Sequence, residues 1–158
     1  MFLNKIKLFL VISICLIFFF LTYNDVKSDE PKIISGIAKV IDGDTIKIEK
    51  NKIRLFGIDA PEKKQHCQKP WLTIFFLTLN KNYKCGEIST NRLKIKINNK
   101  FIICKSSNKD RYNRFIAECF KDKTNINRWM VSSGHAVAYR KYSKKFVSQE
   151  NLAKKEKL

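Results

Sequence analysis

Short runs of β-branched residues, separated by polar pairs, dominate one region in the first half of the chain. The runs cover residues 33–41, 45–49 and 52–56, and the pairs Asp42-Gly43 and Lys50-Asn51 stand between them. Such pairs are typical of tight turns between adjacent strands. The pattern therefore predicts three consecutive strands that pair as a meander.

Two later runs, at 101–105 and 115–121, are rich in Phe, Ile and Cys and flank a polar stretch. They predict a hairpin centred near residues 111 and 112. In that register Cys104 lies directly opposite Cys119, at a separation that a disulfide can span.

Three segments predict helices. Residues 86–98 contain neither Gly nor Pro after the first position, although their apolar spacing mixes helical and strand periods. Residues 125–133 have helical spacing and end at Gly134, and residues 145–157 form a last, polar helix. Five strands with two to three helices in a short basic chain predict an α+β fold built on a small five-stranded OB-fold β-barrel.

Residues 71–79, with the sequence WLTIFFLTL, form an almost unbroken apolar run outside this scheme. We expect the run to be buried against the barrel as an extra strand or turn. The alternative is an exposed patch that contacts a membrane or a partner.

The N-terminus has the pattern of an export signal. Lys5 and Lys7 precede an apolar run at 8–21, and its ~14 residues suit a signal peptide better than a helix of ~20 residues that crosses a bilayer. We therefore predict a signal peptide over 1–28, an exported protein and a single domain over 29–158. An uncleaved N-terminal anchor, which would tether the domain to a membrane, is the alternative.

The cysteine count agrees with export. Cys15 lies inside the apolar run, and four cysteines remain, an even number that predicts two disulfides in an oxidising compartment. If Cys104 pairs with Cys119, Cys67 pairs with Cys85. A zinc site is the weaker interpretation, because the chain has no Cys-x-x-Cys and its two histidines have no ligand spacing.

Charge and composition limit the classes of protein to which the chain can belong. The 158 residues include 32 Lys and Arg against 14 Asp and Glu, a net charge of +18. Because 44% of the residues are hydrophobic, a disordered polycation is excluded, and the length excludes a multidomain machine. Nucleic acid or an anionic membrane surface are the expected partners.

The scarce acidic residues gather within residues 42–62, where five of them accompany Arg54. Carboxylates at a turn and just beyond a strand can converge on one hard cation, and oxygen ligands favour Ca²⁺ or Mg²⁺ over zinc. A further carboxylate could act as a base, and an arginine offers a planar fork to phosphate oxygens. Each feature also has a plain structural interpretation as a turn or an ion pair.

The order of these residues resembles the staphylococcal nuclease-like (thermonuclease) family. The blocks that carry the resemblance are VIDGDT at 40–45, RLFGIDAPE at 54–62 and DRYNR at 110–114, continued by matching residues from Asn125 to Ser143. The resemblance covers about residues 33–158. Asn113 stands where the family has Gly, and Asn is the next best residue for a left-handed backbone.

The resemblance implies an OB-fold nuclease that uses Ca²⁺ to hydrolyse DNA and RNA and leaves 3′-phosphates. By motif position it implies metal binding by the carboxylates of Asp44 and Asp59 and by the backbone carbonyl of Ala60, with Asp42 in the outer shell. It implies Glu62 as the general base.

The same resemblance implies phosphate contacts and a substrate groove. Arg54 and Arg114 would contact the scissile phosphate, and Arg111, Tyr112 and Tyr139 would line the groove. We expect a monomer. The alternatives are a catalytically weak nucleic-acid-binding module of the same fold and a cationic membrane-active protein. The second of these leaves the ordered acidic cluster unexplained.

Overall fold

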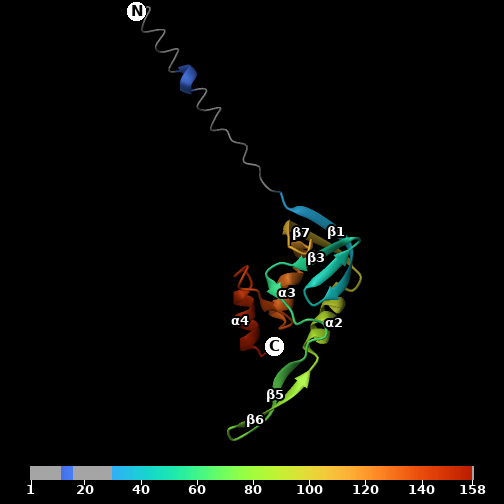
Figure 1. Cartoon of the computed structure of the whole chain (residues 1–158), viewed down its shortest axis with the longest axis vertical. Helices are drawn as coiled ribbons and strands as arrows, with labels where there is room; N and C mark the ends of the chain where they lie inside the picture. Colours follow the sequence, from blue (N-terminus) through green and yellow to red (C-terminus); the bar gives the residue numbers. More distant parts are fainter. Residues whose placement is uncertain (1–11, 16–29, 158) are drawn as a thin grey trace, which may run out of the picture. The chain divides into compact units, whose positions relative to one another are not determined.

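The predicted meander and hairpin form a five-stranded barrel in the computed structural model, which describes residues 12–15 and 30–157 (Figure 1). The barrel strands pair in the order β3-β2-β1-β7-β8, and a parallel pairing of β3 with β8 closes the sheet on itself. The α+β class and the OB-type barrel are confirmed. The barrel strands are β1 (Lys32–Asp42), β2 (Thr45–Ile48), β3 (Asn51–Leu55), β7 (Phe101–Lys109) and β8 (Phe115–Lys121).

The predicted helices are present within a few residues of the expected bounds. They are α2 (Cys85–Ile97), α3 (Ile126–Ser132) and α4 (Val147–Lys155). The mixed spacing of α2 has a simple origin, because Leu93 is fully buried whereas Ile95 remains 69% exposed. Three further strands have only two residues each, namely β4 (Ile58–Asp59), β9 (Thr124–Asn125) and β10 (Val137–Ala138).

The hydrophobic core fills the barrel and the space between it and the helices. Its largest fully buried side chain is Phe146, just before α4, and most of the other fully buried members lie on the barrel strands, α2 and α3, among them Ile46, Ile53, Leu93 and Met130. Every buried polar side-chain atom among the described residues has a hydrogen-bond partner. The polar side chains of the core are therefore satisfied within the protein.

Asn127 is the most enclosed polar residue of that core, with 0% of its surface exposed. Its side chain donates to the carbonyls of Phe56 and Ala117 and accepts from the backbone N–H of Cys119. One side chain thus joins α3 to the two strands that close the barrel.

Two disulfides occur among the described residues, with the pairing expected from the sequence. Cys104 and Cys119 are direct partners in the β7–β8 register and are bonded to each other. Cys67 is bonded to Cys85 at the start of α2. Disulfides are typical of oxidising compartments.

The prediction that residues 71–79 are buried is wrong. They belong to a hairpin of β5 (Cys67–Ile74) and β6 (Leu77–Tyr83), whose strands pair only with each other in the described part of the chain. The hairpin projects away from the barrel (Figure 1), and Phe75 and Phe76 at its tip are 95% and 99% exposed. The run stays in solvent because a hairpin satisfies its own ladder without a place in the barrel.

The predicted leader falls mostly outside the described residues. The chain divides into the units Met1–Glu30 and Pro31–Leu158, and only residues 12–15 of the first are described before Glu30, as a helical turn that includes the exposed thiol of Cys15. No described helix is long and apolar enough to cross a membrane. The signal peptide, the anchor and the domain boundary at residue 28 stay predictions.

Candidate active site

Arg54, on β3, joins two of the carboxylates that the sequence singles out. Its guanidinium forms a salt bridge to Asp44, and its Nη2 lies 2.6 Å from Oδ1 of Asp59. Asp44 is only 4% exposed. Two carboxylates that share one cationic group necessarily face a common point, so the site has a defined centre of positive charge.

The turn between β1 and β2 holds Asp44 in this position. Its Oδ1 accepts from the hydroxyl of Thr45 at 3.0 Å, and its Oδ2 accepts from the backbone N–H of Ala60 at 3.1 Å. Gly43 makes the close approach feasible, because a methyl group there would stand 2.7 Å from the Ala60 side chain and 2.3 Å from the Ser89 hydroxyl. The loop after β4 therefore packs directly on the turn that carries Asp44.

Glu62 lies beside this cluster on an exposed loop. Its pKa is raised above the ordinary value, first because Asp42 is a hydrogen-bond partner and second because the Asp42 carboxylate repels its negative charge. Arg54 acts in the opposite direction on the same pKa. A carboxylate with a raised pKa is a stronger base than an ordinary glutamate.

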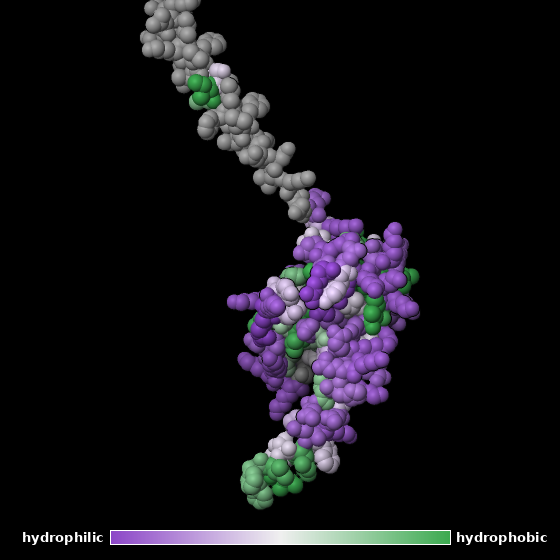
Figure 2. Space-filling view, viewed as in Figure 1, coloured by the Kyte–Doolittle hydropathy of each residue, from purple (hydrophilic) through white to green (hydrophobic). Residues whose placement is uncertain are grey.

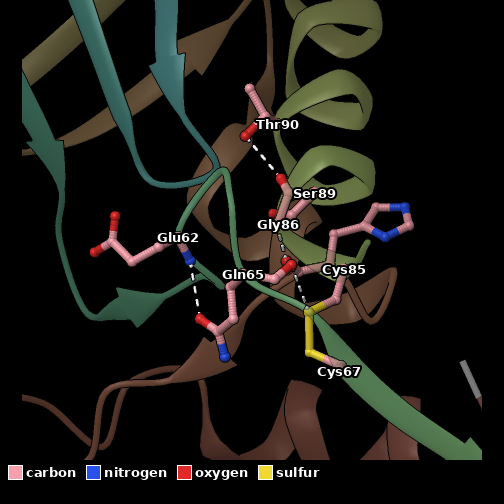
Figure 3. Close-up of a disulfide and its surroundings, with 8 residues drawn as sticks. Glu62, Gln65, Cys67, Cys85, Gly86, Ser89 and Thr90 are labelled. Carbon is pink, nitrogen blue, oxygen red and sulfur yellow. Dashed lines mark hydrogen bonds between the residues drawn. A yellow bond between two sulfur atoms is a disulfide. The ribbon is translucent and has the colours of Figure 1, made fainter. Parts of the chain in front are cut away.

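The backbone around Glu62 is fixed by neighbours at both sides (Figure 3). Its N–H donates to the side chain of Gln65 at 3.1 Å. Its carbonyl lies against Gly86, where a methyl group would stand 1.7 Å from the oxygen. The first turn of α2 thus packs against the Glu62 loop, and the Cys67–Cys85 disulfide links the same turn to β5.

Arg114 lies immediately before β8, the strand that pairs in parallel with the strand that carries Arg54. In the parallel register Arg54 is opposite Ile116, and the buried pair Ile53 and Phe115 marks the core side. Arg114 directly precedes Phe115 and is partly exposed, as Arg54 is. Asp110 holds the Arg114 guanidinium, with 2.7 Å between Nε and Oδ2. No contact among the described residues joins Arg114 to the Arg54 cluster.

Asp110 organises the loop between β7 and β8. It accepts from the backbone N–H groups of Tyr112 and Arg114, and Asn113 has the left-handed φ of +62° that the sequence predicts. Burial raises the pKa of Asp110, but the bonds from Arg114 outweigh it, and the pKa is lowered. Arg111 stacks on Tyr112 with its guanidinium carbon 4.8 Å from the ring centre, so both stand exposed beside Arg114.

Tyr139 approaches the cluster through a short sheet. β10 pairs with β4, and the N–H of Tyr139 donates to the carbonyl of Gly57 at 3.0 Å. Its ring meets that of Tyr142 edge-on at 4.8 Å. Glu150, buried on α4, braces this segment by accepting from the N–H of Ala138 and from Arg140.

A cavity of about 340 Å³ borders the loop that carries Asp59 and Ala60. Asp59 and Ala60 line one side, the base of the hairpin lines another, and His135 lines a third. The pKa of His135 is lowered by burial and by the charge of Arg92, and both causes favour the neutral imidazole. The recess therefore adds space beside the carboxylates.

No three Asp, Glu, His or Cys side chains in residues 30–157 are grouped as a ready metal site. The donors nevertheless suit a hard cation, because Asp44, Asp59 and the Ala60 carbonyl offer only oxygen. Arg54 supplies positive charge at the point that both carboxylates face. The chemistry of the donor set therefore fits Ca²⁺.

Three neighbours of the site were not singled out by the sequence. Gln65 binds the Glu62 N–H, Thr90 lies 3.4 Å from a carboxylate oxygen of Asp42, and Asn127 fixes the strands at the barrel closure. Thr90 is separated from Asp42 by 48 residues. Its signal is only that it is a polar residue on the buried side of a predicted helix.

Comparison with known proteins identifies the family. The family model described as staphylococcal nuclease homologue matches residues 52–158. The chain belongs to this family. The match includes Arg54, Asp59, Glu62 and the Asp110–Arg114 loop, so the resemblance seen in the sequence is confirmed.

Curated relatives of this staphylococcal nuclease homologue come from several bacteria. A protein named succinoglycan biosynthesis protein ExoI from Rhizobium meliloti (strain 1021) is 36% identical over 116 residues, which cover 72% of this chain and 56% of the relative. Proteins named uncharacterized endonuclease come from Escherichia coli O157:H7, with 32% identity, 68% of this chain and 61% of the relative, and from Haemophilus influenzae, with 36%, 68% and 53%. The chain thus spans little more than half the length of these relatives.

Proposed function

We propose that this protein is an exported, Ca²⁺-dependent nuclease that hydrolyses phosphodiester bonds of both DNA and RNA and leaves 3′-phosphates. The observation that carries the proposal is the bridge from Arg54 to Asp44 and Asp59, with Glu62 beside it. This combination offers oxygen ligands, a phosphate-binding cation and a base within one site. Membership of the staphylococcal nuclease homologue family supports the same reaction class.

The proposed cation site consists of the carboxylates of Asp44 and Asp59 and the carbonyl of Ala60, with Asp42 in the outer shell. Burial of Asp44 and its bond to the Ala60 N–H keep these groups together without a metal. When bound, Ca²⁺ would supply Lewis acidity toward a phosphodiester oxygen.

Glu62 is the proposed general base. It takes a proton from a water molecule whose oxygen attacks phosphorus. The bond from phosphorus to the 5′-oxygen then breaks, the 5′-oxygen takes up a proton from solvent, and the phosphate stays on the 3′ side. The raised pKa of Glu62 supports the role, since it makes the carboxylate a better proton acceptor.

Arg54 and Arg114 are the proposed phosphate ligands. Both guanidinium groups are now held by carboxylates, Arg54 by Asp44 and Asp59 and Arg114 by Asp110. Groups fixed in this way need little reorganisation when negative charge grows on the phosphate oxygens in the transition state.

Substrate binding without sequence preference follows from the groups around the site. Arg111, Tyr112 and Tyr139 offer charge and aromatic faces, which contact phosphate and stack on bases of any identity. The basic remainder of the chain, with 23 Lys and Arg against six Asp and Glu over residues 63–158, supports attraction to a polyanion. The two disulfides support export, and the proposed active form is a monomer.

The test measures acid-soluble nucleotides released from DNA and from RNA by the purified protein, first with Ca²⁺ and then with a chelator. We expect release from both polymers with Ca²⁺ and loss of release with the chelator. Cleavage that persists at full rate in the chelator would overturn the metal assignment. Terminal analysis of the products should find the phosphate on the 3′ end.

Variants separate catalysis from binding. Glu62→Gln and Arg114→Ala should each slow cleavage by about 10²- to 10⁴-fold while circular dichroism stays unchanged. Arg128→Ala removes an equal charge from an exposed position of α3 and serves as the matched control, with near-normal cleavage expected. If the protein binds nucleic acid tightly but cleaves none under any metal condition, the binding-module alternative replaces the nuclease.

A further inference from the structure

The β5–β6 hairpin carries a continuous apolar surface that no described residue covers. We call residues 71–79 the apolar tip; Figure 2 shows it as the green end of the hairpin against a mostly hydrophilic domain. The exposed fractions are 67% for Trp71, 41% for Leu72, 51% for Ile74, 95% for Phe75, 99% for Phe76, 58% for Leu77 and 42% for Leu79. Exposed apolar patches of this kind mark binding surfaces.

The fold itself does not explain the residues at the turn. Phe75 and Phe76 connect two strands that pair as far as Ile74 and Leu77, a position where hairpins usually place Asn-Gly or Gly-containing pairs. Phe75 adopts a left-handed φ of +52°, which is strained for a bulky residue. Two phenylalanines in a strained turn, with no packing inside the domain, indicate selection for an external contact.

The hairpin changes from apolar at its tip to basic toward its base. Above the apolar tip, Lys69 and Lys81 are direct cross-strand partners, and Lys84 follows at the start of α2. Like charges that face each other destabilise a strand pair. Lys69 and Lys81 therefore form a basic band that a negatively charged partner would compensate, whereas Lys84 already pairs with Glu87.

We infer that the hairpin docks the protein on an anionic lipid bilayer, with the apolar tip inserted and the basic band at the level of the lipid phosphates. Apolar side chains next to lysines are the combination that binds anionic membrane surfaces. A second copy of the chain is the poorer partner, because its own Lys69 and Lys81 would face the same charges. The inference is independent of the proposed nuclease activity.

The depth of insertion follows from the strand geometry. From Trp71 to Phe75 the strand rises about 13 Å, at about 3.3 Å per residue, which is less than the half-thickness of a hydrocarbon core of about 30 Å. The unpaired backbone edges of a two-stranded hairpin are costly in hydrocarbon, and this cost favours shallow insertion. The tip thus enters one leaflet only, and Trp71 lies in the interfacial zone that tryptophan prefers.

The hairpin is fixed firmly enough to orient the domain. Cys67 and Tyr83 are the last cross-strand pair at its base, and the Cys67–Cys85 bond attaches that pair to α2 (Figure 3). Because the first turn of α2 also contacts the Glu62 loop, membrane docking holds the candidate active site at a set distance from the lipid.

The experiment uses Trp71 as a reporter in the full chain. The protein has two tryptophans, so Trp129→Phe leaves Trp71 alone. We expect vesicles of phosphatidylcholine with phosphatidylglycerol to shift its emission to the blue, and lipids brominated at the upper end of their acyl chains to quench it several-fold more than lipids brominated near the chain terminus, because Trp71 lies at the interface. Phe75→Ser/Phe76→Ser should abolish both effects, and Lys69→Glu/Lys81→Glu should weaken binding by about tenfold or more.

The controls share the same leader and the same vesicles. Phe101→Ser removes an aromatic ring that is 59% exposed on β7, and it should leave the Trp71 signal unchanged. Unchanged Trp71 emission with anionic vesicles would overturn the inference. A blue shift without lipid that grows with protein concentration would assign the tip to self-association instead. Loss of cleavage of dissolved DNA in the Phe75→Ser/Phe76→Ser variant, without any lipid effect, would assign it to nucleic acid.

Discussion

Replacing Gly86 by alanine should disable the candidate active site although it removes none of the charged side chains of the site. In an isolated helix, a change from glycine to alanine would stabilise the helix by about 1 kcal/mol. Here the new methyl group would stand 1.7 Å from the carbonyl oxygen of Glu62, where ordinary contacts begin at 3.4 Å. The Glu62 loop must therefore retreat by about 1.7 Å, and displacements of about 1 Å at a reacting group cost about 10²-fold in rate.

The assay is the rate of Ca²⁺-dependent cleavage under saturating and limiting substrate. We expect Gly86→Ala to reduce kcat by about 10²-fold, with a smaller change in KM, since Arg54 and the groove residues keep their positions. The thermal midpoint should fall by only a few degrees, because the helix gains what the loop contact loses.

A double-mutant cycle separates this mechanism from general damage. If Gly86→Ala acts by moving Glu62, it should have almost no further effect in a Glu62→Gln background. Equal 10²-fold losses in both backgrounds would refute the reasoning, as would a normal rate for the single variant. Glu87→Ala, one residue along the same helix turn and half exposed, is the matched control.

Three further changes test the framework around the site. Asn127→Ala removes three hydrogen bonds to backbone groups, of which the Ala117 carbonyl keeps its bond from the Phe56 N–H, and should lower the free energy of unfolding by about 3 kcal/mol, measured by urea titration; a loss under 0.5 kcal/mol would contradict its bracing role. Cys104→Ser/Cys119→Ser frees a loop of 15 residues and should cost about 3 kcal/mol, with the reduced wild type as control. For Glu150, burial raises the pKa, but bonds from Lys154, Ala138 and Arg140 lower it below 4.5 overall. The stabilisation that Glu150 contributes is therefore complete above pH 4.5 and is lost as pH falls through its lower pKa in the folded protein. The Glu150→Gln variant should unfold at a lower temperature than the wild type at pH 7, and this difference in thermal midpoint should shrink toward pH 3. A difference that persists at pH 3 would count against the ion pair.

Most of the barrel was predictable because its signals are local. The meander follows from β-branched runs and turn pairs, and the Cys104–Cys119 bond follows from counting residues across one hairpin. The parallel closure of β3 on β8 has no local signal, since it joins Arg54 to Ile116. Only the helices and Asn127, far along the chain, enforce it.

In the candidate site, too, the local sequence predicts one part and tertiary packing determines the rest. The identities of Asp44, Asp59, Glu62 and Arg54 are readable from a motif. Their arrangement around the Arg54 guanidinium, and the contact of Glu62 with Gly86, depend on tertiary packing. The apolar tip was misassigned because an apolar pattern records the preference of side chains to leave water and does not say whether protein or lipid receives them.

The Cys67–Cys85 disulfide has one more consequence, for how the chain tolerates change. It lies inside the connection from β3 to β8, so the shortest covalent route between these strands crosses the sulfur atoms and leaves residues 68–84 off the path. The entropy lost when the two strands meet then no longer depends on the length of the hairpin. The hairpin can therefore be lengthened, shortened or replaced without an added entropic cost to the pairing of β3 with β8.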